Sequence, residues 1–495
     1  MKETRKKKEF IILTLMLVGY LIFNGILLIG HELWRDEANV WLFARDTTPL
    51  QLLREIKYQG HPCLWYFIVM PFAKLGLPFK TISVISFLVM TAAAGLFTYQ
   101  APFHPITKTI CLFCPIFSYY YSVVARNYCL IAILFILLAY CYPRRNEKSV
   151  LYGFLLGLLV QADTIALVAA GGISLMWLWE GVHSSLKERK WLPFWQTAMG
   201  LWIPLASLGL WIAEFWQVSD SPEFHMHTLS YTEMLTEIRN FSYHILTRMT
   251  GQGETFDLLL ILLFLAAGVL LSVKLKNFWP MLVMAGAFIF EAVFSIMVYQ
   301  LHIWHYIALC FTLIWFFWLG CMKDNQGRNR TGRVLAEGIL ILLGVTMFIR
   351  WNSPEESSSL SNALSGVYSD GVNAADYIKR NIAEDELIVS TDVSEASTVL
   401  AYLGRNYTFY FAGNLKPESY ANYNEDQQGS ISYEELMLWI KRNFPHKDSF
   451  YLLKSESSCV KEIPAEEKEK WKVCYRTEGD TARGESYTLY RIMVR

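Results

Sequence analysis

Two adjacent carboxylates in the stretch Trp34-Arg35-Asp36-Glu37 are the residues best suited to acid–base chemistry. Neighbouring residues of a helix point about 100° apart, so Asp36 and Glu37 would have different roles. A carboxylate beside Trp and Phe side chains at a membrane surface would be partly desolvated, which raises its basicity. Such a group suits a general base that takes a proton from a hydroxyl. The alternative is a charged pair on a solvated helix, bridged to Arg35 or Arg45.

Further side chains could contact an anion. Arg126 precedes an apolar run, and both its charge and the N-terminus of the following helix would favour a lipid phosphate; snorkelling toward the headgroups is the alternative. Asp163 lies between two apolar runs, and an acid within a membrane usually has a function. His302 and His305 can share one helix face and contact a phosphate or a metal ion. His61 could bind a phosphate or hold a loop.

Eleven apolar runs predict a polytopic α-helical membrane protein. A bilayer core of ~30 Å requires about 20 helical residues. Of the 495 residues, 54% are hydrophobic and 18% charged, which excludes a soluble cytoplasmic enzyme. The 44 basic and 44 acidic residues cancel, so no net field attracts nucleic acid. The predicted spans are 10–30, 79–99, 107–123, 127–142, 149–162, 164–180, 193–214, 256–273, 278–299, 303–322 and 334–350.

Basic loops predict the orientation in the cell membrane. Lysines and an arginine before the first span predict a cytoplasmic N-terminus. With eleven spans, the other short basic loops also lie in the cytoplasm. Counting the apolar segment 61–77 as a span would place them all outside, so we interpret it as an interfacial or re-entrant helix. This predicts that the loop 31–78 and the tail 352–495 lie on the outer face.

The polar tail, 352–495, is predicted to be a separate soluble α/β domain after a membrane domain of residues 1–351. Its length of about 140 residues suffices for one such domain. Residues 371–383 have the pattern of an amphipathic helix. Alternating apolar residues predict strands at Glu386–Thr391, Tyr407–Phe411, Ser449–Leu453, Lys472–Arg476 and Tyr487–Val494.

One string in the tail has most of the spacing of a calcium-binding EF-hand loop. Its candidate ligands are Asn424, Asp426, Gln428 and Glu435, and 433–443 could be the exit helix. The alternative is a polar turn followed by a helix N-terminus. In an oxidising compartment the two tail cysteines, Cys459 and Cys474, could pair.

The order of these motifs resembles the GT-C superfamily of integral-membrane glycosyltransferases. Within it, the chain looks like the family 39 type, which includes protein O-mannosyltransferases and lipid A aminoarabinose transferases. The topology is similar over about residues 10–350. The resemblance rests on Trp34-Arg35-Asp36-Glu37-Ala38, Gly60-His61-Pro62-x-Leu64-x-Tyr66 and Ala125-Arg126-Asn127-Tyr128.

The resemblance implies roles for several residues. Asp36 matches the catalytic base of the first outer loop, Glu37 its acidic neighbour, and Arg126 a contact to the lipid phosphate. His61, His302 and His305 are further candidates for the phosphate, and Asp163 and Tyr128 are other candidate site residues. Asn127 stands near the place of a metal-binding Asp in some relatives, and Cys63 replaces a usual Pro.

The resemblance implies a sugar donor linked to a polyprenyl phosphate and transfer on the outer face, which predicts a hexosyltransferase. Its acceptor would be a hydroxyl of a cell-envelope glycan, lipid or protein, and direct displacement would invert the sugar. No cofactor is required by this chemistry, and a divalent metal remains open. The alternatives are a transporter, in which paired charges lie near the bilayer midplane, and a non-catalytic scaffold or sensor that displays the tail.

Overall fold

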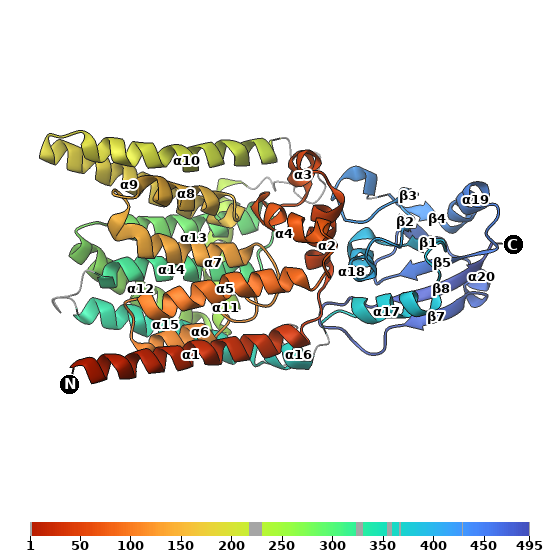
Figure 1. Cartoon of the computed structure of the whole chain (residues 1–495), viewed down its shortest axis with the longest axis horizontal. Coiled ribbons are helices and arrows are strands. Elements are labelled where there is room, and N and C mark those ends of the chain that lie inside the picture. The colour runs from red at the N-terminus through yellow and green to blue at the C-terminus, as the bar shows by residue number, and fades with distance from the viewer. Residues whose placement is uncertain are drawn as a thin grey trace. The chain divides into compact units, whose positions relative to one another are not determined.

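The structure is a computed structural model that describes residues 2–216, 230–322, 330–353, 359–365, 368–427 and 429–494. Contacts group the chain into two units (Figure 1). The first, the bundle unit, holds Met1–Ile26, Ser86–Trp216 and Phe224–Ser353. The second, the α/β unit, holds Leu27–Ile85 and the described residues of Pro354–Arg495. By packing, the predicted outer loop therefore groups with the tail.

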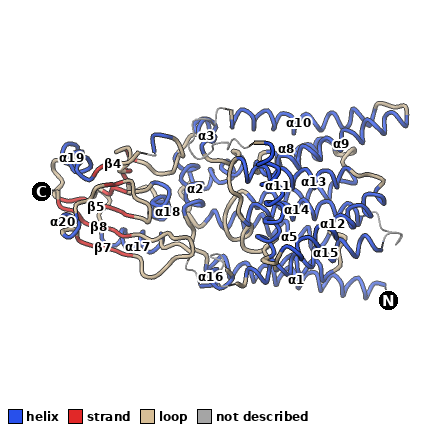
Figure 2. The backbone as a smooth tube through the Cα atoms, turned by 180° about the vertical axis from the view of Figure 1, so that it is seen from behind, coloured by secondary structure: helices blue, strands red, loops and turns tan. Residues whose placement is uncertain are grey.

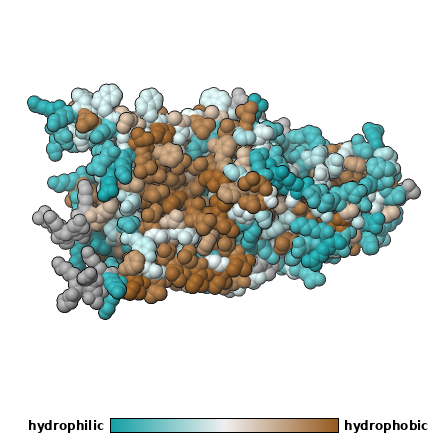
Figure 3. Space-filling model, viewed as in Figure 1, coloured by the Kyte–Doolittle hydropathy of each residue, from teal (hydrophilic) through white to brown (hydrophobic). Residues whose placement is uncertain are grey.

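The bundle unit consists of helices. Eight helices of the described chain are long and apolar enough to cross a membrane: α1 (Lys2–Gly30), α5 (Thr81–Gln100), α9 (Leu167–Glu188), α10 (Leu192–Phe215), α12 (Glu254–Leu275), α13 (Trp279–Met297), α14 (Ile303–Met322) and α15 (Arg330–Trp351). Figure 3 shows hydrophobic side chains over the bundle and hydrophilic ones over the α/β unit. The chain is a polytopic α-helical membrane protein, as predicted.

Shorter helices complete the bundle unit: α6 (Pro105–Phe113), α7 (Tyr128–Cys141), η2 (Tyr142–Arg144), α8 (Ser149–Val160), η3 (Thr164–Ala166) and α11 (Tyr231–Thr250). The predicted break within 149–180 is confirmed, because α8 ends before Asp163 and η3 begins after it. The polar helix α11 lies in a stretch that the sequence indicated only as a loop.

The predicted helix over 107–123 is wrong. α6 ends at Phe113, and residues 114–127 form buried turns. Tyr119 has a φ of 67°, which ends regular helix geometry. A buried amide replaces the helical hydrogen bonds, since Asn24 Oδ1 accepts the Tyr119 N–H at 3.2 Å and the Ser122 hydroxyl at 2.7 Å. Apolar composition alone did not reveal this partner 95 residues away.

The α/β unit has a six-stranded sheet in the order β3-β2-β1-β5-β8-β7. Figure 2 draws the strands of this unit in red. β1 is parallel to β2 and β5, and the outer pairs are antiparallel. The predicted α/β domain and all five predicted strands are confirmed. The strands are β1 (Ile388–Ser390), β2 (Phe409–Phe411), β3 (Lys416–Pro417), β5 (Ser449–Lys454), β7 (Lys472–Arg476) and β8 (Thr488–Met493), with a separate pair of β4 (Ile431–Ser432) and β6 (Val460–Lys461).

The helices of the α/β unit come from both ends of the chain. From the N-terminal part they are α2 (Arg35–Asp46), α3 (Pro49–Glu55), η1 (Ile56–Tyr58) and α4 (Leu64–Lys74). From the tail they are α16 (Leu360–Ser365), α17 (Gly371–Asn381), α18 (Val393–Leu403), η5 (Glu425–Gln427), α19 (Tyr433–Asn443) and α20 (Ala465–Glu469). α4 has 11 residues and extends about 16 Å, half of a bilayer core. Its interfacial position stays a prediction.

Candidate functional site

Asp36 and Glu37 lie in the first turn of α2, where the helix dipole favours negative side chains. Glu37 is fully buried, and its Oε2 accepts the Trp34 N–H at 3.1 Å. The same oxygen lies 3.1 Å from Nε2 of His31, which is also buried. Asp36 is partly exposed. Glu37 therefore holds the start of the helix, and Asp36 is the carboxylate of the pair that solvent reaches.

Arg35 connects this turn to the tail. Its N–H donates to Oε1 of Glu485 at 2.8 Å, and its guanidinium donates to Glu395 at 3.3 Å. Glu485 is buried and also accepts the hydroxyls of Ser369 at 2.6 Å and Thr398 at 3.2 Å. These donors favour the ionised carboxylate, but burial outweighs them and raises the pKa of Glu485 to about 7.

Two amide side chains make a second connection between α2 and the tail. Asn39 Nδ2 donates to Gln59 Oε1 at 2.7 Å. The backbone of Ala421 donates to Asn39 at 2.7 Å and accepts from Gln59 at 2.9 Å. Leu33 N–H also donates to the Tyr402 hydroxyl at 3.1 Å. α2 is thus fixed near its start and at its middle, which preorganises any group that it carries.

His61 follows Gly60, whose φ of 72° lies in the left-handed region, which glycine adopts without strain. This turn places His61 three residues before α4, in the same unit as Asp36 and Glu37. The other predicted site residues belong to the bundle unit: Arg126, Tyr128, Asp163, His302 and His305.

In the bundle unit, Asp163 meets the start of α7. Asn127 Nδ2 donates to Asp163 Oδ2 at 2.6 Å and to the carbonyl of Ala162 at 2.7 Å. The other carboxylate oxygen caps η3 by accepting the N–H of Ile165 at 2.9 Å. Asn127 therefore acts as a donor to the Asp163 carboxylate. Asp163 positions the two helix starts that meet here.

Tyr128, the first residue of α7, and His305, in the first turn of α14, form a second contact between helix starts. The Tyr128 hydroxyl lies 3.0 Å from His305 Nε2, and His305 Nδ1 accepts the backbone N–H of His302 at 2.9 Å. A neutral ring that accepts at Nδ1 carries its proton on Nε2, so His305 donates to Tyr128. The Arg126 guanidinium lies 5.8 Å from the centre of the Tyr128 ring. His305 is buried and His302 is exposed.

This arrangement changes the interpretation of the two histidines. Both ring nitrogens of His305 already have partners, so a metal ion or a phosphate could bind there only by displacing one of them. The ring centres of His302 and His305 lie 6.1 Å apart. Among the residues that the structure describes, no group of three or more His, Cys, Asp or Glu side chains is arranged to hold a metal ion.

The proposed calcium loop has other interactions. Asp426 forms an ion pair with Lys416 at 2.8 Å, and Glu435 accepts the N–H of Ser432 at 3.1 Å as part of a capping box at the start of α19. These contacts also suit the alternative of a polar turn followed by a helix N-terminus, and the calcium site stays a prediction. Asn424 accepts a backbone N–H from Gln427 at 3.2 Å; Gln428 lies outside the described residues.

Cys459 and Cys474 are both free, so the pairing considered for them is absent from the structure. The pKa of the Cys459 thiol is raised to about 12, chiefly by burial, which keeps it protonated.

Two acids were missed by the sequence reasoning. Glu291 on α13 is 1% exposed, and the only signal for it is an acid within an apolar run. Glu485 lies in a polar segment, where nothing in the sequence marks it as buried. Its role depends on contacts with residues 116 and 450 positions away.

Comparisons with known proteins identify a fold. No protein-family model and no curated protein sequence matches the chain. Among solved structures, the chain is similar to ArnT from Cupriavidus metallidurans in the apo state, with 11% identity, 97% of each chain covered and a TM-score of 0.55. ArnT bound to undecaprenyl phosphate also matches, with 11% identity, 97% of each chain covered and a TM-score of 0.46. The likeness to the apo structure shows a shared fold.

Proposed function

We propose, from the GT-C-type fold that the chain shares with ArnT, that it is a membrane glycosyltransferase. Its donor is a sugar linked to a polyprenyl phosphate, and its acceptor is a hydroxyl of a cell-envelope molecule. The observation that carries the proposal is the first turn of α2. There the partly exposed Asp36 lies between a fully buried Glu37 and an Arg35 anchored to the tail.

In the proposed reaction, Asp36 takes the proton from the acceptor hydroxyl. The acceptor oxygen forms a bond to the anomeric carbon of the donor sugar. The bond from that carbon to the phosphate oxygen breaks, and its electron pair leaves with the polyprenyl phosphate. Direct displacement inverts the anomeric centre and needs no covalent intermediate.

The leaving phosphate gains negative charge, which a cation stabilises. Arg126 supplies that charge, and His61 and His302 are additional donors. His305 contributes indirectly, because its Nε2 proton orients the hydroxyl of Tyr128, whose ring centre lies 5.8 Å from the Arg126 guanidinium. Asp163 keeps the start of α7 in place through Asn127.

The distribution of charge within the bundle supports the predicted orientation. Arg126, Asp163 and His302 lie at the starts of α7, η3 and α14. The basic loops follow the opposite ends of these helices. Arg145 at the end of η2 pairs with Glu180 of α9 at 2.7 Å, and Asn277 donates to the same carboxylate at 2.9 Å. Since basic loops stay in the cytoplasm, we place the candidate site end outside it.

The orientation predicts that the tail is accessible outside the cytoplasm. Protease added to spheroplasts should cut within residues 354–495, and an N-terminal tag should stay intact until the membrane is lysed. Immunoblots of both ends measure this. A tail that is protected before lysis and cut after it would contradict the orientation.

Arg126 provides the test of the donor. The purified chain should carry a polyprenyl phosphate that mass spectrometry identifies. Arg126→Ala should reduce retention of the lipid at least tenfold and transfer by about 10²- to 10³-fold, as when one transition-state donor is removed. Both quantities are measured on detergent-purified protein with a synthetic polyprenyl-phosphate hexose.

The matched control is Arg144→Ala, which removes an exposed arginine just beyond the opposite end of α7. It should leave lipid retention and transfer unchanged. Equal losses in both variants would point to a general effect of removing a cation, and no loss in Arg126→Ala would reject its role with the phosphate.

A further inference from the structure

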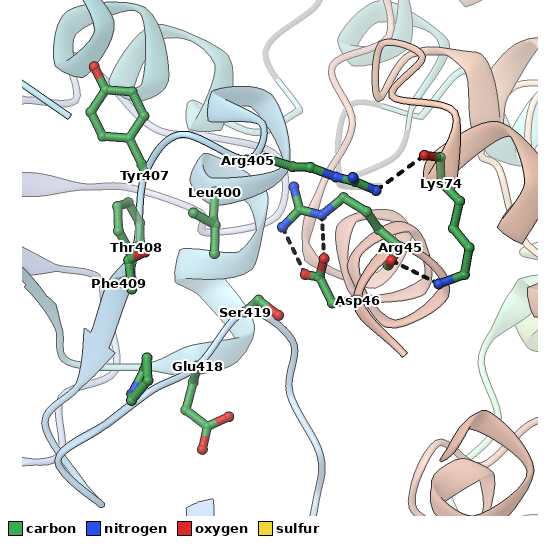
Figure 4. A pocket seen from close by; sticks show the side chains of 11 residues that line it. Arg45, Asp46, Lys74, Leu400, Arg405, Tyr407, Thr408, Phe409, Glu418 and Ser419 are labelled. Atoms are coloured by element: carbon green, nitrogen blue, oxygen red, sulfur yellow. Dashed lines mark hydrogen bonds and ion pairs between the residues drawn. The ribbon is translucent and has the colours of Figure 1, made fainter. Parts of the chain in front are cut away.

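The α/β unit contains a pocket of about 720 Å³ that none of the predicted site residues lines. Figure 4 shows it between the C-terminal end of α2, the C-terminal residue of α4, and the segments around β2 and β3. We call it the α2 pocket. Its charged side chains are Arg45, Asp46, Lys74, Arg405 and Glu418.

One ion pair is built into the wall of the α2 pocket. Arg45 is 9% exposed and donates to both carboxylate oxygens of Asp46, at 2.7 and 2.8 Å. Its third nitrogen donates to the carbonyl of Gly404 at 2.8 Å. The guanidinium is therefore fixed, and the charge of Asp46 is balanced by its neighbour.

Two further cations lie at the rim. Lys74 Nζ donates to the carbonyl oxygens of Thr47 at 2.6 Å and Arg45 at 3.3 Å. The Arg405 guanidinium donates to the carbonyl of Lys74 at 3.3 Å. Within the described ranges, neither cation has a carboxylate within ion-pair distance. A guanidinium has five N–H groups, so Arg405 retains donors for a ligand.

The pocket therefore has one more positive than negative side chain. Glu418 is held by Asn414, whose amide donates to it at 2.8 Å. Thr408 and Ser419 add hydroxyl groups to the lining. An oxyanion fits the two rim cations, and a polyol fits the hydroxyls and Glu418. These features together favour a sugar that bears a phosphate or a carboxylate.

The pocket lies at the opposite end of α2 from the proposed base. Asp36 and Asp46 are ten residues apart in one helix, which corresponds to about 15 Å. A group bound in the pocket is therefore too far from Asp36 to be the reacting hydroxyl. It is at a distance that suits a more remote unit of the same acceptor.

We propose that the α2 pocket binds a phosphate or carboxylate group of an acceptor glycan, about 15 Å from the hydroxyl that reacts. The inference rests on the proposed function, since a transferase requires an acceptor. The chemical class of acceptor is thereby narrowed to anionic glycans. An anionic lipid headgroup offers the same phosphate, but the hydroxyl-bearing wall of Thr408 and Ser419 favours a sugar.

Binding to the full chain in detergent tests the proposal without any need for turnover. Isothermal titration would use trigalacturonate as the carboxylate probe, glucose 6-phosphate as the phosphate probe and maltotriose as the neutral probe. At least one anionic probe should bind at least tenfold more tightly than maltotriose. Arg405→Glu should weaken that binding at least tenfold, and Lys74→Gln should weaken it several-fold.

The matched control is Arg380→Glu, which reverses another exposed arginine of the same unit, on α17, and should leave binding unchanged. Asp36→Asn should also bind the probe normally, so loss of the pocket and loss of the base give different results. The proposal is overturned if no anionic probe binds, or if Arg405→Glu binds as tightly as the original chain. It is also overturned if the original chain and Arg405→Glu differ only in their binding to phosphatidylglycerol vesicles and bind every soluble sugar probe equally.

Discussion

Asp36→Asn is expected to reduce sugar transfer by about 10²- to 10⁴-fold, the range for loss of a general base. Asn has nearly the size and shape of Asp but cannot take the proton from the acceptor hydroxyl. Asp36 is partly exposed, and the helix start is held by Glu37 and Arg35, so the variant should fold. Transfer from a synthetic polyprenyl-phosphate hexose to envelope membranes measures activity, and thermal unfolding measures folding.

The matched control is Asp385→Asn, which changes an 86%-exposed aspartate of the same unit. It should retain full activity and the same unfolding temperature. Full transfer by Asp36→Asn would reject the proposed mechanism, and an absence of transfer in the original chain would favour the transporter or scaffold alternative.

Glu485→Ala is expected to destabilise the connection between α2 and the tail. It leaves the Arg35 N–H and the buried hydroxyls of Ser369 and Thr398 without their acceptor, and an unsatisfied buried group costs about 1–3 kcal/mol. Hydrogen exchange should rise in peptides that contain residues 31–46 and 368–371. The transfer rate should fall with it, because Asp36 follows Arg35 directly in the helix.

The pH dependence of stability distinguishes the buried carboxyl from a surface one. The pKa of Glu485 is raised by burial from 4.5 to about 7. Between these values the unfolded chain is ionised and the folded chain is protonated, so the folded state binds more protons. The contribution of Glu485 to the free energy of unfolding is therefore complete below pH 4.5 and falls as the pH rises to about 7, by at most about 1.4 kcal/mol per pH unit.

Glu485→Gln lacks this titration and keeps a carbonyl acceptor. The unfolding free energy of the original chain minus that of Glu485→Gln should therefore decrease as the pH rises from 4.5 to 7. Glu466→Ala, which changes an exposed residue on α20, serves as the control. It should change neither the hydrogen exchange of residues 31–46 and 368–371 nor the pH dependence of the unfolding free energy. A constant difference across this pH range would contradict the raised pKa.

Local patterns in the sequence predicted most elements correctly. The long helices follow from runs of apolar residues, because a helix satisfies its own backbone within a bilayer. The strand Lys472–Arg476 and the helix Tyr433–Asn443 have the predicted bounds, since alternation and a capping Ser432 are signals within a few residues. The break at Asp163 follows from the same kind of signal.

Features that depend on long-range contacts could not be predicted from local patterns. The helix predicted over 107–123 fails because Asn24 supplies hydrogen bonds to the turns after Phe113. The sequence places Asp36 and Glu37 side by side with nothing to separate them. Only the packing shows that Glu37 is buried in contact with His31 and the Trp34 N–H, while Asp36 is partly exposed.

By itself, the sequence determined a polytopic membrane protein with an α/β tail, and it pointed to the first turn of α2. Those conclusions depend on hydropathy and spacing, which act along the chain. The tertiary structure decided that α2 belongs with the tail, through Glu485, Ala421 and Tyr402, and that Arg45, Lys74 and Arg405 line one pocket. Burial and the meeting of residues more than 300 positions apart are properties of packing, and no local pattern encodes them.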